Sequence, residues 1–244
     1  MFFQRHKVQK VRDLVYSAHK IFVLTGAGIS AASGVPTFRG STKSLWKNLE
    51  FMKYAHAETL REDPQGVWQA HEYMRSLIDG CKPNAGHLAL QKLAGEHEVA
   101  LFTQNVDGLH QSGTFYAHEM HGSIHDLACA SADCEYKEMA PRNRLLEQRE
   151  VCPKCGSYMR HDTVLFGEPV RFFDEMIAAL AGANLVIFIG TSGLVTDTRA
   201  ICNYAKSKAV PVVEVNTAVF TRVTLCADIV VRDRAEHFLA DLVA

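Results

Sequence analysis

The sequence predicts an α/β fold: a Rossmann-like parallel sheet with helices on both faces and a small additional lobe. Three observations favour this class. The apolar run Ile21–Thr25 ends in Gly26-Ala27-Gly28, a tight turn of the kind that follows a strand. The run Leu185–Ile189 is almost continuously apolar, as expected of a strand buried on both faces. Two close pairs of cysteines separate these runs and indicate a distinct small module.

Composition limits the kinds of protein that fit. The chain has 244 residues, of which 48% are hydrophobic, enough for one large domain with a small insert. Its 26 basic and 27 acidic residues nearly cancel, so no overall field attracts nucleic acid or a membrane surface. We see no apolar run long enough for a signal peptide or a membrane span. We therefore expect a monomeric cytoplasmic protein without nucleic-acid or membrane partners.

The first half of the chain predicts helices around two strands. Apolar residues from Val8 to Ala18 share one face of a helix that precedes the strand Ile21–Thr25. Residues 43–78 have helical periodicity and no strong strand, which indicates a helical lobe. After a break at 83–86, a helix over His87–Leu93 leads to the strand Val99–Thr103.

The second half predicts a return to the sheet at Val164–Glu168 and an apolar helix face over Phe172–Leu180. Leu185–Ile189, Val212–Val215 and Asp228–Val231 follow as strands. We assign residues 1–40, 81–128 and 159–244 to the Rossmann-like domain, and 41–80 with 129–158 to the small domain.

The stretch Leu24–Arg39 is the most informative part of the sequence. Gly26 and Gly28 lack a Cβ, so the backbone can turn tightly and approach a pyrophosphate, with Ala31 at the third position of the dinucleotide pattern. Residues 29–33 could open a helix whose first amides hold negative charge. A tight turn in any α/β protein would look similar, but Gly34–Arg39 ends in an aromatic ring and a fixed cation, as a loop over a cofactor requires.

Polar side chains follow the strand Val99–Thr103. Gln104, Asn105 and Asp107 come directly after it, at the edge of a parallel sheet where open α/β folds bind ligands. An ordinary polar loop would explain one such residue. Two amides and a carboxylate within four residues favour a binding site.

The cysteines indicate zinc. Cys129-x4-Cys134 and Cys152-x2-Cys155 stand 17 residues apart and supply four thiolates for a closed, structural zinc site. The residues between the pairs carry mixed charges, which disfavours a nucleic-acid-binding ribbon. We expect the other three, Cys81, Cys202 and Cys226, to be small buried hydrophobes.

The chain resembles the sirtuins, NAD-dependent protein-lysine deacylases, and specifically their short bacterial type with a single catalytic core. The resemblance rests on motifs in the family's order: GAGISAASGVPTFRG, TQNVDGLH, MHG, the two cysteine pairs, FGE, GTS and EVN. These motifs span Thr25 to Asn216, nearly the whole chain.

The resemblance implies a role for each matching residue. His121 matches the general base, an imidazole that titrates near neutral pH; Asn105 would order the ribose and a water, and Asp107 would receive the nicotinamide carboxamide. The implied NAD-binding residues are Gly26, Ala27, Gly28, Ser30, Thr37, Phe38, Arg39, Gln104, Asn105, Val106, Asp107, Gly190, Thr191, Ser192, Asn216 and Ala235. The implied peptide-binding residues, which would pair with an extended acyl-lysine peptide, are Val164, Phe166, Gly167, Glu168, Gly193, Leu194 and Val195.

The implied reaction consumes NAD. The acyl oxygen attacks the ribose carbon that bears nicotinamide, a ribose hydroxyl deprotonated by His121 then attacks the imidate carbon, and water completes the reaction. The products are nicotinamide, free lysine and O-acyl-ADP-ribose. In members that prefer succinyl or malonyl groups, a Tyr and an Arg bind the acyl carboxylate. The matching positions in this sequence are His71 and Met74. The chain should therefore prefer uncharged acyl groups. His161 and Asp197 also depart from the family pattern, and nothing in the sequence explains them.

Two other functions fit the same motifs. NAD glycohydrolysis or protein ADP-ribosyl transfer would use the same pocket with water or a protein nucleophile. A non-catalytic NAD sensor or a zinc-stabilised binding module is the third possibility. His121 and the FGE segment favour deacylation, because simple hydrolysis needs neither.

Overall fold

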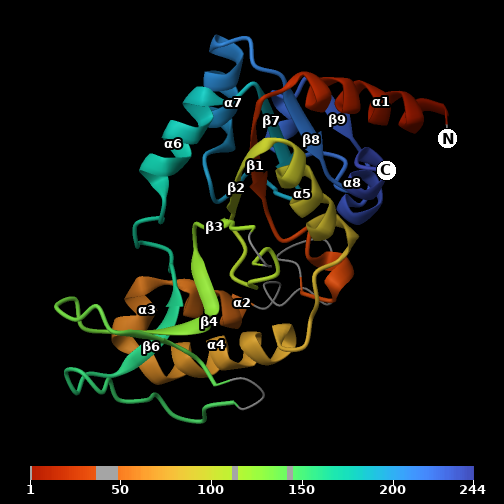
Figure 1. Cartoon of the computed structure of the whole chain (residues 1–244). Coiled ribbons are helices and arrows are strands. Elements are labelled where there is room, and N and C mark those ends of the chain that lie inside the picture. Colours follow the sequence, from red (N-terminus) through yellow and green to blue (C-terminus); the bar gives the residue numbers. More distant parts are fainter. Residues whose placement is uncertain (1, 37–48, 112–114, 142–144) are drawn as a thin grey trace.

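The computed structural model describes residues 2–36, 49–111, 115–141 and 145–244 (Figure 1). A large parallel sheet occupies one part of the molecule, and a smaller lobe lies at the opposite end from α7 and α8 (Figure 1). Within the described ranges, no helix combines the length and apolar character needed to cross a bilayer.

The large sheet has six strands in the order β3-β2-β1-β7-β8-β9, and all neighbouring strands run parallel. The strands are β1 (Lys20–Thr25), β2 (Glu98–Thr103), β3 (His118–Glu119), β7 (Leu185–Ile189), β8 (Val212–Val215) and β9 (Ile229–Val231). The chain builds outward from β1 in one direction through β2 and β3, and in the other from β7 to β9. The carboxyl ends of β1 and β7 therefore form the topological switch point, where such sheets bind ligands.

Helices cover both faces of this sheet because its central strands are apolar on both sides. Ile21 and Val23 of β1 pack against α1 (Phe2–Ser17), α5 (Ala85–Glu96) and α8 (Ala235–Leu242). Phe22 and Leu24 point the other way, toward α6 (Phe173–Gly182) and α7 (Thr198–Ser207). This alternation confirms the predicted Rossmann-like architecture.

The smaller lobe combines helices with a three-stranded antiparallel sheet of order β5-β4-β6. Its elements are α2 (Leu49–Met52), α3 (Ala57–Glu62), α4 (Pro64–Ile78), β4 (Gly122–Cys129), β5 (Lys137–Met139) and β6 (Met159–Thr163). Trp68 of α4 is buried against Leu127 and Met159, and α4 lies beside β4 and β6 (Figure 1). Short 3-10 turns complete the chain: η1 (Ala31–Ser33), η3 (Lys53–Ala55) and η4 (Val223–Leu225).

Two predicted elements differ from the structure. The helix expected to open at residues 29–33 is only the three-residue turn η1, because Gly34 ends it in the left-handed region. The expected strand Val164–Glu168 is wrong: β6 ends at Thr163, and the chain then turns, with the Glu168 amide donating to the Leu165 carbonyl at 2.9 Å. Only the isolated parallel bridge between Phe166 and His56 remains of that strand.

The structure explains His161 and Asp197. His161 is buried on β6, and its Nε2 lies 2.7 Å from the Glu72 carboxylate of α4, which also accepts two bonds from Arg75. Asp197 caps α7, accepting a hydrogen bond from the Ala200 amide at 3.1 Å. His161 therefore joins α4 to the small sheet, and Asp197 begins a helix.

The expectation for the unpaired cysteines was partly wrong. Cys202 of α7 and Cys226 after η4 are buried, as expected, but they form a disulfide with their Cα atoms 6.0 Å apart. Cys81 is a free, half-buried thiol. The sequence offered no sign of this pairing because 24 residues separate the two cysteines.

Candidate active site

The loops that follow β1 and β7 touch each other through glycine. The Gly26 amide donates to the Ile189 carbonyl at 2.9 Å, and the Gly28 amide donates to the Gly190 carbonyl at 3.0 Å. A Cβ on Gly28 would lie 2.6 Å from the Gly190 Cα, and one on Gly26 would lie 2.9 Å from the Thr191 Cα. No side chain fits at either position, so the glycine pattern is needed for contact between the two loops.

We expect the Gly28→Ala substitution to destabilise the fold by about 2 kcal/mol or more, because its new methyl group meets backbone that cannot move aside. The matched control is Gly95→Ala at the end of α5, where a Cβ meets nothing within 4 Å. Urea unfolding of both variants checks this. Equal stability of the two variants would show that the loops can separate at little cost.

Most amides of the β1 loop are already engaged. Besides Gly26 and Gly28, the Ile29 amide donates to the Gly26 carbonyl and the Ser30 amide to the Ala27 carbonyl. Within the described part of the chain, the Ala27 amide has no acceptor. The predicted phosphate cradle therefore offers an amide of the loop rather than a row of amides at a helix terminus.

Ser30 lies among the buried polar side chains at the base of the site, and with Asn105 and Asp107 it forms what we call the polar floor. Its buried hydroxyl oxygen lies 3.3 Å from His87 Nε2 and accepts a bond from Asn105 Nδ2 at 3.2 Å. Both lone pairs of the hydroxyl are thus used. Burial raises the pKa of the Asp107 carboxyl, and the Ser30 hydroxyl lies near enough to that carboxyl to oppose this effect. The side chain therefore orients Asn105, one of the residues that the sequence assigns to NAD.

His87 is a further residue of the site, and it belongs to none of the motifs that indicated NAD in the sequence. It lies at the third position of α5, where the Asn84 amide donates to its Nδ1 at 3.2 Å in a capping box. Because Nδ1 accepts, Nε2 carries the proton and donates to Ser30. Burial lowers the pKa of His87 to about 4 and keeps the ring neutral. The signal available beforehand was the N-cap pattern Asn84-x-x-His87.

Asn105 and Asp107 are buried at the end of β2. The amide group of Asn105 donates to the Gly26 carbonyl at 3.3 Å and to Ser30, so both of its protons are used. Among the described residues no donor reaches its Oδ1, which is left as an acceptor. Asp107 accepts from the Leu109 amide at 3.0 Å, and burial raises the pKa of this carboxyl.

Gln104 and Asn216 meet at Thr191 on the other side of the switch point. Gln104 Nε2 donates to the Thr191 hydroxyl at 3.2 Å, and Asn216 Nδ2 donates to the Thr191 carbonyl at 2.8 Å. Residues from the ends of β2, β7 and β8 therefore form one continuous polar edge.

His121 lies directly beside this edge, in the turn between β3 and β4. Its Nδ1 donates to the Gln104 carbonyl at 2.7 Å, which leaves Nε2 unprotonated in the neutral ring. Burial lowers the pKa of His121, and the bond to Gln104 opposes that effect. At neutral pH the ring is therefore a free base held in one orientation, as a general base requires.

Buried histidines should make stability depend on pH. Burial lowers the pKa of His71 to about 3 and that of His110 to about 3, whereas the unfolded ring titrates near 6.5. The unfolded state alone takes up these protons between pH 6.5 and about 3, so stability is complete above pH 6.5 and falls as pH decreases. We expect a loss of about 1–2 kcal/mol for each buried histidine at pH 5.

Urea unfolding at pH 7.5 and pH 5 measures this loss. A His71→Gln variant does not titrate but can still donate to the Val67 carbonyl and accept from Thr163, as the native ring does. Its stability should fall less between the two pH values than that of the native chain. An equal fall in both would contradict burial as the cause.

The segment after β6 runs beside His121. The Val164 amide donates to the His121 carbonyl at 2.8 Å, and Phe166 exchanges backbone bonds with Ala55 and Ala57. On the other loop, the Gly193 amide donates to the Thr191 hydroxyl at 3.2 Å, while Leu194 and Val195 are exposed. Phe166 thus has its backbone partners within the chain, which limits how a peptide could pair here.

The remaining predicted NAD residues lie in different places. Thr37, Phe38 and Arg39 are outside the described residues. Val106 is half-buried in a cluster with Ile124 and Leu109. Ser192 is exposed after β7, and Ala235 is buried at the start of α8.

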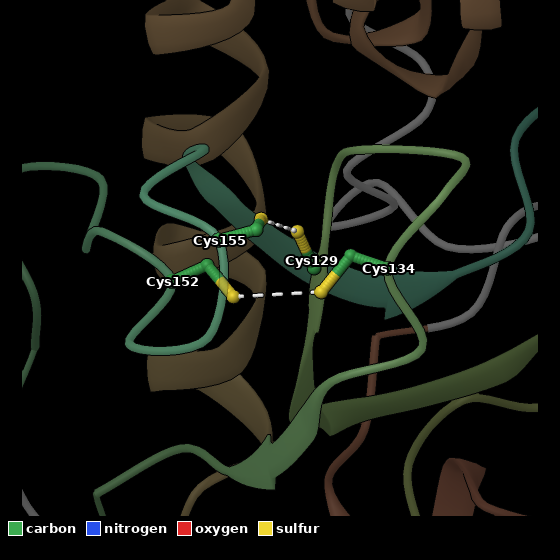
Figure 2. Close-up of side chains that lie close together, drawn as sticks. All are labelled: Cys129, Cys134, Cys152 and Cys155. Carbon is green, nitrogen blue, oxygen red and sulfur yellow. Dashed lines mark hydrogen bonds between the residues drawn. The ribbon is translucent and has the colours of Figure 1, made fainter.

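The four cysteines of the two pairs converge in the small lobe (Figure 2). All four sulfur atoms lie within 4.8 Å of one another, with Cys129–Cys155 at 3.4 Å and Cys134–Cys152 at 3.8 Å. Four thiolates at about 2.3 Å from a tetrahedral zinc ion would be about 3.8 Å apart, so the cluster fits zinc. With four protein ligands such an ion has a structural role.

Fold and site together define a Rossmann-like protein with a polar site at its switch point and a four-cysteine module in a second lobe. The model of the Sir2 family matches residues 26–197, and the chain belongs to this family.

Curated relatives match over most of their length. A protein of Thermococcus kodakarensis named NAD-dependent protein deacylase is 36% identical over 239 residues, covering 94% of this chain and 91% of that protein. A protein of the same name from Mycolicibacterium paratuberculosis is 35% identical and covers 91% of this chain and 96% of its own. A solved Sir2 homologue in complex with NAD superposes with a TM-score of 0.87 at 29% identity, covering 96% of this chain and 92% of that one.

Proposed function

We propose that this protein removes acyl groups from protein lysines at the expense of NAD, giving nicotinamide, free lysine and O-acyl-ADP-ribose. The observation that carries the proposal is His121, held by Gln104 as a free base beside Asn105 and Asp107. The deacylase names of its relatives support the same reaction.

The site residues fit NAD through their hydrogen-bonding groups. The unpartnered Ala27 amide suits a phosphate oxygen, and the open Oδ1 of Asn105 suits a ribose hydroxyl or a water molecule. Asp107, aligned by the Leu109 amide, can accept from a carboxamide. Gln104, Thr191 and Asn216 would lie along the ribose and adenosine half of the dinucleotide.

NAD supplies the activated glycosidic carbon that the acyl oxygen attacks as nicotinamide leaves. The chain's own contribution is a buried floor that excludes water and a base that takes a proton from a ribose hydroxyl through His121 Nε2. The deprotonated ribose hydroxyl would attack the imidate carbon, and one water molecule, admitted after nicotinamide has left, would release the lysine as its free amine and leave O-acyl-ADP-ribose. The base distinguishes the deacylase from a simple NAD glycohydrolase.

The acyl pocket should favour uncharged groups. A small cavity between α4 and β6 is lined by Val67, Trp68, His71, Thr163 and Leu165, and also by Arg149 and Arg160. Arg160 is already paired with Glu168, and Arg149 donates to the Met159 carbonyl. Thr163 pairs with Gly122 next to His121. His71 is neutral and bonded to Thr163. Arg75, adjacent to Met74, is buried and bonded to Glu72, so its position does not suit an acyl carboxylate.

We place this activity in a monomer in the cytoplasm, acting on acyl-lysine proteins and not on nucleic acid. All the residues of the proposed site come from one chain, and the net charge is only −1. The four cysteines of the cluster are free thiols, as a reducing compartment would keep them, although Cys202 and Cys226 are joined in a disulfide.

The deciding experiment incubates the purified protein with NAD and acetyl-, butyryl-, succinyl- or lipoyl-lysine peptides, and follows peptide and ribose products together by mass spectrometry. We expect acyl loss matched by O-acyl-ADP-ribose, with the succinyl peptide slowest. Nicotinamide release with every peptide unchanged would instead establish glycohydrolysis or ADP-ribosyl transfer.

A further inference from the structure

The Phe166-Gly167-Glu168 motif forms a closed turn. The Glu168 amide donates to the Leu165 carbonyl at 2.9 Å, and Gly167 has a φ of +95° at the third position of the turn, where a type II turn requires glycine. The Glu168 side chain also turns back and accepts from the Leu165 amide at 2.8 Å. The turn is therefore fixed by one bond from the main chain and one from a side chain.

Arg160 holds the carboxylate that closes this turn. Its NH1 and NH2 donate to the two oxygens of Glu168 at 2.5 and 3.0 Å, and NH2 also donates to the Thr163 carbonyl at 2.7 Å. Both side chains are largely shielded, with 17% and 26% of their surfaces exposed. A two-pronged bond of this kind fixes orientation as well as distance.

The turn leaves few backbone groups for a ligand. The Val164 amide is bonded to His121, and both backbone groups of Phe166 are bonded to Ala55 and Ala57. Among the described residues, the Val164 carbonyl and both backbone groups of Gly167 have no backbone partner. A peptide lying beside His121 can therefore bond at these two positions, and not along a continuous strand.

We propose that Arg160 and Glu168 are positioning residues for the acylated peptide. They hold the turn so that the Val164 carbonyl and Gly167 face the peptide, and neither side chain takes part in the chemistry. This role rests on the proposed deacylase function. The Glu168 side chain stabilises the turn, and the backbone groups of the turn contact the peptide.

The test compares Arg160→Gln, Glu168→Gln and the double variant. Binding of an acetyl-lysine peptide is measured by fluorescence anisotropy without NAD, and kcat and both KM values by steady-state kinetics. We expect each single variant to weaken peptide binding at least tenfold, with kcat at saturating peptide and the KM for NAD within threefold. The double variant should bind the peptide no more weakly than either single variant, because both substitutions break the same Arg160–Glu168 ion pair. Arg160→Lys should bind the peptide more tightly than Arg160→Gln but more weakly than the native protein, since an ammonium group cannot form the two parallel bonds of a guanidinium.

The matched control is Asp162→Asn. Asp162 lies on β6, as Arg160 does, and forms a neighbouring two-pronged pair with Arg171, which follows the turn; the substitution disrupts this pair but none of the bonds within the turn. It should lower Tm without weakening peptide binding. Unchanged peptide affinity in Glu168→Gln, or equal losses for peptide and NAD, would overturn the proposal.

Failure of this inference can be told apart from failure of the proposed function. A native protein that binds the acetylated peptide and does not deacylate it would refute the function, and the variants would still test the turn. A native protein that binds no acyl-lysine peptide would overturn the inference itself.

Discussion

Replacing His121 with alanine should lower kcat/KM by about 10²- to 10⁴-fold while NAD binding remains within a fewfold of the native value. The base is lost, but the floor formed by Ser30, Asn105 and Asp107 does not depend on it. Because burial lowers the pKa of His121, the native rate should stay constant at neutral pH and fall only in more acidic solution.

Steady-state deacylation assays and calorimetric NAD titrations measure the two effects separately. The control is His121→Asn, whose side-chain amide can still donate to the Gln104 carbonyl as Nδ1 does, but cannot accept a proton at neutral pH. We expect the same loss of turnover in both variants. Activity within tenfold of native in either one would remove the base assignment.

Removing zinc should unfold the smaller lobe. Its buried cluster is small and includes three of the four cysteines, so metal binding has to supply much of its stability. Structural zinc sites of this kind contribute about 10 kcal/mol of apparent binding energy in small domains. Cys152→Ala, or treatment with a chelator, should therefore abolish deacylation and lower Tm.

Trp68 provides a direct readout of this unfolding. It is buried in the same cluster, and its Nε1 donates to the Leu146 carbonyl at 2.9 Å. In a Trp46→Phe background its emission should shift to longer wavelength as zinc leaves. Cys81→Ser, which changes a cysteine outside the cluster, should keep the native spectrum. A native spectrum in the zinc-free protein would show that apolar packing alone maintains the lobe.

Local patterns predicted much of the fold. The apolar runs at Ile21 and Leu185 became central strands, and the cysteine spacing predicted a cluster that the structure brings together. These features depend on residues close in the sequence, or on burial from both faces, and so leave a visible pattern. The Val164–Glu168 strand was wrong because the prediction placed this segment at the sheet as the return from the cysteine module and did not consider the turn that Gly167 allows.

The missing parts of the candidate site depend on long-range pairs. Ser30 and His87 are 57 positions apart, and Glu72 and His161 are 89 apart. Of these four, His87 and Glu72 each look like an ordinary polar residue in the sequence. Only packing α5 against β1, or α4 against β6, shows that the pairs exist, and no single-sequence pattern encodes that packing.

The glycine contact between the β1 and β7 loops has a consequence for how a dinucleotide would be received. With no side chain between Gly28 and Gly190, the loops have no space to adjust and their backbones are set in place during folding. The backbone of the two loops would then already be ordered before a ligand binds, so the protein would lose little conformational entropy there on binding. Engineering this protein to accept an altered cofactor should therefore start from the side chains around Gln104 and Asn216, and leave the two glycine loops unchanged.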